Sequence, residues 1–244
     1  MFRFLFNKKS QVEAKLPYST ELHCHIIPAV DDGSASLEDS LELCTRLKAL
    51  GVNKILATPH CTESTFENTV ETIEPQFNSL VEGLASSGVD IELHFSFEYR
   101  IDDNFLNIFK NKLIKPLPGN YVLVENSFIQ PSWNLENLLY ELKLQGYIPI
   151  LAHPERYLYY ASDKSIYTKL YDQGTLFQIN LLSFAGFYGK NVQRTALWML
   201  EKGYVDFIGT DCHNMTQIVA IEDYLKSKAY QKIKDQFKLL NDTL

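Results

Sequence analysis

Apolar residues along the chain recur in short blocks, and each block is followed by a polar turn and then by a stretch with apolar residues at helical spacing. Blocks such as Val122-Leu123-Val124 are apolar on both faces, as in buried parallel strands. The pattern occurs seven times and predicts strands at 19–25, 53–58, 91–98, 121–126, 147–152, 176–181 and 205–210. It therefore predicts a repeated βα unit.

The stretches with helical spacing predict eight helices, at 37–50, 65–86, 102–110, 134–145, 163–173, 190–202, 217–227 and 229–241. Ser36 precedes the first of them and Asp39 follows three residues later, which is typical of a capping box. Four of the helices are expected to end at a glycine, namely Gly51, Gly146, Gly174 and Gly203.

Histidines and carboxylates stand at or just after the ends of the predicted strands. The candidate ligands are His23, His25, Asp31, His60, Glu98, Glu125, His153, Asp211 and His213. Alternate residues of a strand share a face, so two imidazoles can bind one ion at His23 and His25. Carboxylate and imidazole groups drawn from distant segments favour a multinuclear metal site. For Asp32, in Asp31-Asp32-Gly33, a turn role is expected instead.

The positions of these ligands decide between two arrangements of βα units, an open doubly wound sheet and a closed barrel. Side chains from the ends of six of the seven strands meet only in a closed ring. We therefore expect an α/β fold, a (β/α)7 barrel of the TIM-barrel type, with its site at the C-terminal ends of the strands. The barrel domain is expected at 18–244, after an N-terminal extension at 1–17 whose apolar residues, among them Phe2, have no assigned role.

Composition narrows the function. Thirty acidic against 23 basic residues give a net charge of −7, which argues against a protein that binds nucleic acid through phosphate contacts. The chain has no apolar run long enough for a membrane span or a signal peptide, so a cytoplasmic location is expected. The four cysteines form no CxxC pair and are predicted to be buried, small apolar residues: Cys24, Cys44, Cys61 and Cys212.

Two further features bear on the chemistry. Glu98 and Glu125 end apolar strands, where a carboxylate is costly unless it binds a metal or pairs with an arginine. A cysteine-dependent phosphatase needs an arginine six residues after its nucleophile, but Val30 follows Cys24 at that spacing and Glu67 follows Cys61. The sequence therefore excludes that class of enzyme.

Several segments together resemble the PHP family, named for polymerase and histidinol phosphatase. They are 23–33, with His-Cys-His and Asp-Asp-Gly; 57–60, Ala-Thr-Pro-His; 152–157, Ala-His-Pro-Glu-Arg-Tyr; and 209–214, Gly-Thr-Asp-Cys-His-Asn. The resemblance covers nearly the whole chain after residue 17. It is greatest to the bacterial protein tyrosine phosphatases of capsule and exopolysaccharide operons, and it implies a distorted (β/α)7 barrel.

The resemblance also implies three divalent metal ions, with manganese expected and iron, zinc or cobalt as alternatives. The implied ligand sets are His23, His25, Glu98 and Asp211; Asp31, His60 and His213; and Glu98, Glu125 and His153. Glu98 would bridge two ions. Three divalent ions and four carboxylates would leave a charge of about +2 for a phosphate dianion.

The implied reaction is hydrolysis of phosphotyrosine by a metal-activated hydroxide, with Arg156 and Arg100 as the candidates to hold the phosphate. The implied partner is a tyrosine-phosphorylated protein, the tail of a bacterial tyrosine kinase that regulates polysaccharide export. Two positions depart from the pattern: Glu21 replaces an aspartate, and no arginine follows Asn214. The alternatives are a small-molecule phosphomonoesterase of the histidinol-phosphatase kind and a non-catalytic metal-binding regulatory module.

Overall fold

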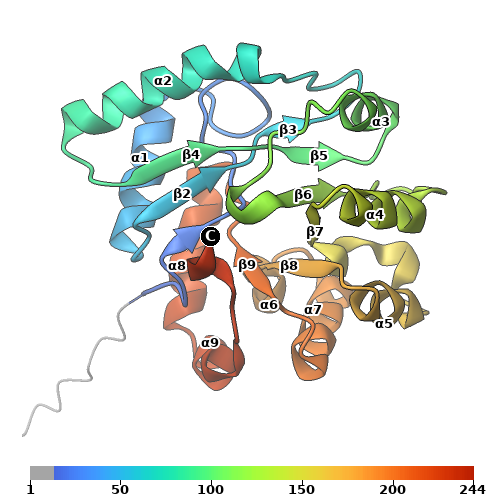
Figure 1. Ribbon diagram of the computed structural model, residues 1–244. Helices are drawn as coiled ribbons and strands as arrows, with labels where there is room; N and C mark the ends of the chain where they lie inside the picture. The colour runs from blue at the N-terminus through green and yellow to red at the C-terminus, as the bar shows by residue number, and fades with distance from the viewer. Residues whose placement is uncertain (1–13) are drawn as a thin grey trace, which may run out of the picture.

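A computed structural model of the protein describes residues 14–244 (Figure 1). The proposed N-terminal extension is therefore described only from Ala14 onward, and Phe2 and the apolar residues near it lie outside the described part. From Tyr18 to the C-terminus the chain forms a mixed α/β fold around a curled, half-barrel parallel sheet.

The sheet is built from nine short strands. They are β1 (Thr20–Glu21), β2 (Lys54–Ala57), β3 (His60–Cys61), β4 (Glu92–Phe95), β5 (Glu98–Arg100), β6 (Tyr121–Glu125), β7 (Ile148–Ala152), β8 (Leu176–Asn180) and β9 (Phe207–Gly209). All pairings are parallel, in the orders β1-β2-β4 and β3-β5-β6-β7-β8-β9. The seven predicted strands are thus present, two of them with a continuation after a short break.

The breaks lie between β2 and β3 and between β4 and β5. Pro59, which has no N–H to donate, interrupts the first of these paths. Backbone hydrogen bonds from Ser96 N to Ala57 O (2.9 Å) and from Glu98 N to Pro59 O (3.1 Å) keep the two paths side by side. The chain direction is therefore maintained through the break, and His60 and Glu98 follow it at the same level, where they pair in register.

The first and last strands meet without pairing along their length. At their C-terminal ends, the backbone N–H of His25 donates to the carbonyl of Cys212 (2.9 Å), within an isolated parallel bridge. At the other end, the side-chain amide of Asn241 donates to the carbonyls of Thr20 (3.0 Å) and Ile208 (2.8 Å). The C-terminus accordingly lies beside β1 (Figure 1).

Helices cover the outside of the sheet (Figure 1). They are α1 (Leu37–Ala49), α2 (Val70–Ser87), α3 (Asp103–Lys110), α4 (Leu135–Leu144), α5 (Ser165–Asp172), α6 (Leu181–Ala185), α7 (Lys190–Lys202), α8 (Met215–Lys226) and α9 (Lys228–Ile233). Short 3-10 turns span Pro118–Asn120, Pro154–Arg156, Leu158–Tyr160, Lys234–Gln236 and Asn241–Thr243. Helix α6 was not predicted.

Local sequence explains where the helices begin and end. The Ser36 hydroxyl accepts a hydrogen bond from the Asp39 N–H (3.1 Å), as predicted for α1. Helix α2 starts five residues later than predicted, because Thr69 and Thr72 form a reciprocal capping box at Val70. The predicted last helix is shorter than expected, since α9 ends at Ile233. The four glycines expected at helix ends all have positive φ.

Most of the strands are buried on both faces, as the continuous apolar blocks predict, whereas β4 exposes Glu92 and His94. One set of side chains packs outward against the helices, whereas a second, separate set packs within the curl of the sheet. The inner set comprises Leu22, Leu56, Leu117, Leu123, Ile150, Ala152 and Phe207. Each large member contributes about 1.5–3 kcal/mol by leaving water. Most of this inner cluster lies on or directly beside strands that lead to the candidate ligands, and Leu117 precedes β6.

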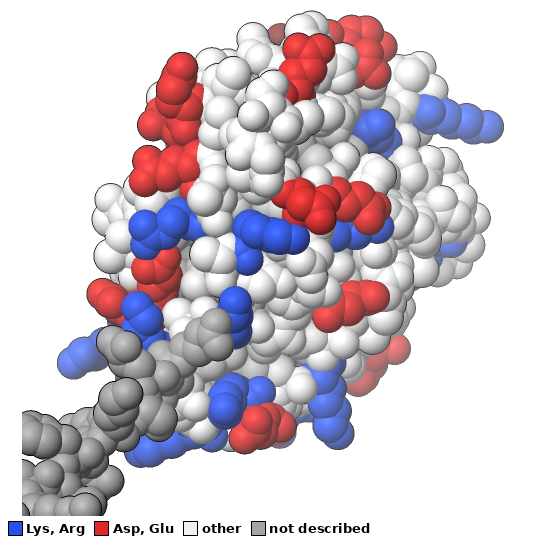
Figure 2. Space-filling view, turned by 90° about the vertical axis from the view of Figure 1, so that its left-hand side faces the viewer, with Lys and Arg blue, Asp and Glu red and all other residues white. Residues whose placement is uncertain are grey.

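The described surface carries charges of both signs. On the face at the left of Figure 1, lysine and arginine side chains are interspersed with aspartate and glutamate, and neither sign forms a continuous area (Figure 2). Within residues 14–244, none of the helices has the length and apolar character needed to cross a membrane.

Candidate metal centre

Four buried side chains that were predicted as one ligand set come together just after β1 and β9 and at the start of β5. The Nε2 atoms of His23 and His25 are 3.4 Å apart. A single oxygen of Glu98 lies 3.3 Å from Nε2 of His23 and 3.5 Å from Nε2 of His25. One oxygen of Asp211 lies 3.5 and 3.4 Å from the same two nitrogens. Two imidazoles and two carboxylates thus face one point.

A second group contains Asp32 where the sequence analysis expected Asp31. Oδ1 of Asp32 lies 3.5 Å from Nε2 of His60 and 3.5 Å from Nε2 of His213. The buried Asp31 carboxylate is turned away from them, because it accepts from Nδ1 of His25 (2.8 Å) and from the backbone N–H of His60 (3.0 Å). The structure therefore brings together Asp32, His60 and His213, and Asp31 orients one of their neighbours.

The remaining predicted ligands lie on two sides of Glu98. One Glu98 oxygen is 2.7 Å from Nε2 of His153, and the other is 3.1 Å from Nδ1 of His60. Oε1 of Glu125 lies 3.7 Å from Nδ1 of His60, although the prediction grouped Glu125 with Glu98 and His153. Glu125 forms a group with Glu98 and His60, whereas His153 forms one with Glu98 and His23. Glu98 belongs to both groups, as expected of a bridging residue.

The buried atoms fit divalent cations. Oε2 of Glu98 and Nδ1 of His60 are buried and lie 3.1 Å apart without forming a hydrogen bond, and Oε2 of Glu125 is also buried without a hydrogen-bond partner. Unpartnered buried polar atoms are costly, and a group of them at one place calls for a ligand. Carboxylate oxygen with imidazole nitrogen is the donor set of manganese, iron, zinc and cobalt sites.

The charges of the centre perturb its pKa values in a consistent way. Burial alone would lower the pKa of His23, but Glu98 and Asp211 raise it to about 9. Burial raises the pKa of Glu125 to about 7, and the nearby Glu98 carboxylate adds to the shift. Burial lowers the pKa of His153 to about 4 despite its contact with Glu98. The carboxylates of the centre thus favour positive charge beside them, whereas His153 favours the neutral form that binds metals.

Amide side chains on β8 orient two of the ligands. Oε1 of Gln178 accepts from Nδ1 of His23 (2.7 Å), which turns Nε2 toward the centre. The amide of Asn180 donates to Asp211 (2.6 Å) and its backbone N–H donates to Glu155 (3.0 Å). Sequence reasoning missed these residues. The sequence did carry a signal for them, because Gln178 and Asn180 are amides at alternate positions of a predicted strand, 176–181.

Glu21 supports the backbone of the ligand strands. Its carboxylate is fully buried and accepts from the backbone N–H of His23 (2.9 Å) and of Thr210 (3.1 Å), and from the Tyr18 hydroxyl (2.8 Å). The sequence analysis noted that Glu21 replaces an aspartate. In the structure it ties together the two strands at the seam and does not touch an imidazole through its carboxylate.

Two candidate ligands have left-handed backbone conformations, which are uncommon for residues other than glycine. The φ angles are 32° at His153 and 48° at Asp211. Such strain costs about 1–3 kcal/mol at each position and is typical of functional sites.

Gly33, near these residues, leaves no room for a side chain, because a Cβ at this position would lie 2.2 Å from the carbonyl oxygen of His25.

The two predicted phosphate-binding arginines have different surroundings. Arg100 pairs with Glu125 (3.1 Å). Arg156 pairs with Asp211 (2.9 Å), and its guanidinium lies between two aromatic rings, 4.6 Å from the centre of the Phe128 ring and 4.4 Å from that of Tyr188. Sequence reasoning identified neither ring, since each stands in a predicted loop. Arg156 is therefore held on three sides beside the ligands.

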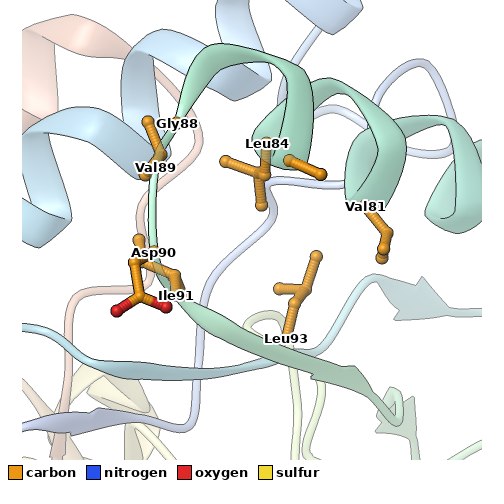
Figure 3. Close-up of a pocket in the computed structure, with 8 residues that line it drawn as sticks. Val81, Leu84, Gly88, Val89, Asp90, Ile91 and Leu93 are labelled. Carbon is orange, nitrogen blue, oxygen red and sulfur yellow. The ribbon is translucent and has the colours of Figure 1, made fainter.

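The centre opens into a cavity of about 310 Å³, whose lining includes Asp32, His60, Glu125, Phe128, His153 and Arg156. Another cavity lies between the end of α2 and the start of β4 (Figure 3). Its lining is apolar apart from Asp90, and none of the candidate ligands contributes to it. Convergent polar groups mark a binding site better than size does, so the first cavity is the candidate active site.

The cysteines are not nucleophiles. All four are buried and free, as predicted from their spacing. Burial raises the pKa of the Cys61 thiol and of the Cys44 thiol to about 12, and it raises that of Cys24 and Cys212 as well. A thiol with a raised pKa is a poor source of thiolate, which agrees with the absence of a phosphate-loop arginine.

Comparison with known proteins gives consistent matches. The family model described as "Capsular polysaccharide synthesis, CpsB/CapC" matches residues 19–241. Tyrosine-protein phosphatase YwqE of Bacillus subtilis (strain 168) is 31% identical over 196 residues, which cover 80% of this chain and 77% of the relative. Tyrosine-protein phosphatase CpsB of Streptococcus pneumoniae is 28% identical over 201 residues, covering 80% and 83%.

A solved structure agrees with these matches. It is described as one of YwqE from Bacillus subtilis and CpsB from Streptococcus pneumoniae, metal-dependent tyrosine phosphatases. It superposes with a TM-score of 0.76 at 27% sequence identity, and the match covers 88% of this chain and 91% of that chain.

Proposed function

The chain belongs to the capsular polysaccharide synthesis family CpsB/CapC, and from this membership we propose that it is a metal-dependent protein tyrosine phosphatase. The observation that carries the proposal is the position of Glu98 beside the cavity-lining His60 and His153, within 3.5 Å of nitrogens from His23, His25, His60 and His153. The names of the relatives support both the substrate class and the requirement for metal.

We propose three divalent ions, with manganese expected and iron, zinc or cobalt as alternatives. The proposed ligand sets are His23, His25, Glu98 and Asp211; Asp32, His60 and His213; and Glu98, Glu125 and His153. The second set uses Asp32 because Asp31 already accepts from His25 and His60. Bound ions would supply positive charge for the phosphate and would lower the pKa of a water molecule.

The protein's own side chains position the substrate. We propose that Arg156 donates hydrogen bonds to phosphoryl oxygens. Its contacts with Phe128, Tyr188 and Asp211 already restrict its side-chain rotamers, so it loses less conformational entropy when the substrate binds. Phe128 stacks on His153 with ring centres 5.3 Å apart, and it offers an apolar wall to the aryl ring of the substrate. A tyrosine leaving group has a pKa of about 10 and therefore needs less acid assistance than an alcohol.

We propose that the curled sheet acts as a distorted (β/α)7 barrel in a single domain at 18–244. The separate inner cluster of Leu22, Leu123 and their neighbours supports closure, as does the hydrogen bond between His25 and Cys212 at the seam. The proposed partner is a tyrosine-phosphorylated protein, the tail of a bacterial tyrosine kinase that controls capsule or exopolysaccharide export. The proposed location is the cytoplasm.

The decisive experiment compares two substrates on one preparation. The protein is treated with a chelator and metal is added back, and turnover of a phosphotyrosine peptide is measured against that of histidinol phosphate. We expect metal-dependent turnover with a preference for the peptide. A preference for histidinol phosphate would favour the small-molecule phosphatase. Turnover of neither substrate with metal bound would favour the regulatory module.

A further inference from the structure

The loop between β6 and α4 exposes large apolar side chains next to the metal centre. The exposed fractions are 41% for Phe128, 88% for Ile129 and 92% for Trp133. Single exposed apolar residues are common, but three of them in one short loop beside the candidate active site favour an interaction site there. Tryptophan is also the residue most enriched among those that dominate binding energy at interfaces.

The base of this loop is fixed. Oδ1 of Asn126 accepts from the backbone N–H groups of Ser127 (3.0 Å) and Ser132 (2.9 Å), which closes the loop across its base. The Tyr159 hydroxyl donates to the Ser127 carbonyl (2.7 Å), and the Tyr157 hydroxyl accepts from the Asn126 N–H (2.8 Å). The start of the loop is thus bonded to Tyr157 and Tyr159, its end is bonded to its start through Ser132 and Asn126, and the apolar residues are presented on a preorganised backbone.

A groove lies beside the loop, with a volume of about 430 Å³. Ile101, Leu106, Trp133 and Leu138 give it apolar walls. Two acidic residues, Asp102 and Asp103, stand at its edge. The apolar walls fit an apolar side chain of a bound polypeptide. The two carboxylates favour a neutral or basic residue next to that side chain and repel an acidic residue.

The groove adjoins the candidate active site at two places along the chain. On β5, Arg100 pairs with the candidate ligand Glu125, and the next residue, Ile101, lines the groove. After β6, Ser127 lines the groove and the next residue, Phe128, lines the metal-centre cavity. A polypeptide with its phosphotyrosine in the cavity would therefore pass the groove with its neighbouring residues.

From this arrangement we infer that the groove and Trp133 form a docking site for an apolar side chain of the substrate polypeptide, a few residues from the phosphotyrosine. The inference rests on the proposed phosphatase function and adds the feature of the substrate that is recognised. Small aryl phosphates occupy only the cavity and do not reach Trp133. Trp133 is thus a specificity residue that acts on polypeptide substrates alone.

The test uses the full-length metal-loaded protein, the Trp133→Ser variant and three substrates. These are para-nitrophenyl phosphate, a phosphotyrosine peptide with leucines on both sides, and the same peptide with glycines. We expect the variant to lose about tenfold in kcat/KM on the leucine peptide, the equivalent of one buried apolar side chain. We expect changes below about twofold on the glycine peptide and on para-nitrophenyl phosphate.

Leu144→Ser is the matched control, because Leu144 is 67% exposed at the far end of α4. It should leave all three rates unchanged. Equal kcat/KM of wild type and Trp133→Ser on the leucine peptide would overturn the docking site and leave the phosphatase function intact. Failure of wild type to hydrolyse either peptide would overturn the proposed function and the docking site with it.

A binding measurement gives an independent reading. The chain has two tryptophans, and Trp133 is almost fully exposed. Addition of a non-hydrolysable phosphonate analogue of the leucine peptide should shift the tryptophan emission to shorter wavelength. The shift should disappear in Trp133→Phe and should be absent with the glycine analogue. A shift of equal size with both analogues would contradict docking in the groove.

Discussion

Nδ1 of His25 lies 2.8 Å from a carboxylate oxygen of Asp31, and this contact determines which of two adjacent aspartates faces the metal centre. Burial would raise the pKa of Asp31, but its contacts, with His25 first among them, outweigh this and lower it to about 2. Because the Asp31 oxygens are occupied by His25, His60 and Gly33, its neighbour Asp32 is left to face His60 and His213.

Substitution of the two aspartates should therefore give different metal contents. Asp32→Ala removes a proposed ligand, so we expect the variant to bind one metal ion fewer at saturation. Asp31→Ala frees the His25 ring but removes no proposed ligand, so we expect full occupancy with affinity about 10- to 100-fold weaker. Metal titration followed by elemental analysis separates them. Loss of one ion in Asp31→Ala and none in Asp32→Ala would return Asp31 to the ligand set.

Chelation and the His153→Ala substitution test the metal requirement. His153 contacts Glu98 at 2.7 Å and belongs to a proposed ligand set. We expect chelated protein to lose phosphatase activity and to regain it when manganese is added. We expect His153→Ala to lose at least about a hundredfold in kcat even at saturating metal. His94→Ala is the control, since His94 is exposed and pairs only with Glu92 among the described contacts. A fully active His153→Ala protein would contradict the proposed centre.

Metal affinity should rise with pH. The pKa of His23 is raised to about 9, so its ring holds a proton at neutral pH when no cation replaces it, and the raised pKa values of His25 and His60 favour protons on their rings in the same direction. A metal ion must displace these protons, and binding therefore strengthens as pH increases toward 9. Calorimetry in two buffers of different ionisation enthalpy should detect proton release at pH 7. Binding without proton release would be inconsistent with these shifts.

Arg156→Lys should reduce activity although it retains the charge. Lysine has no planar guanidinium to lie between Phe128 and Tyr188 or to bind two phosphoryl oxygens. A charge-assisted hydrogen bond contributes about 1.5–3 kcal/mol, so we expect kcat/KM to fall about 10- to 100-fold. Arg194→Lys serves as the control, because Arg194 contacts Asn191 on the exposed face of α7. Unchanged activity of Arg156→Lys would remove the proposed phosphate role.

Glu155→Gln tests a buried carboxyl that holds Asn180. Burial raises the pKa of Glu155 from 4.5 to about 7 in the folded protein. The folded state therefore holds the proton more tightly than the unfolded state, and stability decreases as pH rises from 4.5 to 7. This difference corresponds to about 3 kcal/mol.

Glutamine carries no charge and still offers an oxygen to Ser183 and to the Asn180 N–H. We therefore expect the free energy of unfolding of Glu155→Gln, relative to wild type, to be greater at pH 8 than at pH 5. Urea denaturation at the two pH values measures this. A difference independent of pH would show that Glu155 is ionised in both states.

The sequence predicted the elements well because most of them are long periodic patterns with clear caps. Helix α7 begins and ends where its pattern does, at Lys190 and Lys202. The breaks near Pro59 and Phe97 could not be predicted from the sequence. Backbone hydrogen bonds between the two paths keep each one in the same direction after its break, so each pair of short strands reads as one continuous strand. Helix α6 has five residues and was too short for a periodic signal.

The sequence identified the candidate ligands, which the structure brings together, but it could not sort all of them into the groups that the structure shows. Asp31 and Asp32 are identical in type and adjacent, so only the position of His25 distinguishes them. Gln178 and Phe128 carry no metal-binding signal, and their roles depend on which segments the fold places next to them. Pairing of Glu98 with several histidines was foreseeable because a buried strand-end carboxylate needs partners.

The seam between the first and last strands has a consequence for synthesis of the protein. His23 and His25 are translated well before Asp211 and His213. Asn241, which joins both strands at their other ends, is made later still. A growing polypeptide on the ribosome therefore holds only part of the centre until residue 213 has been translated, and a chain that terminates before it cannot become a working enzyme.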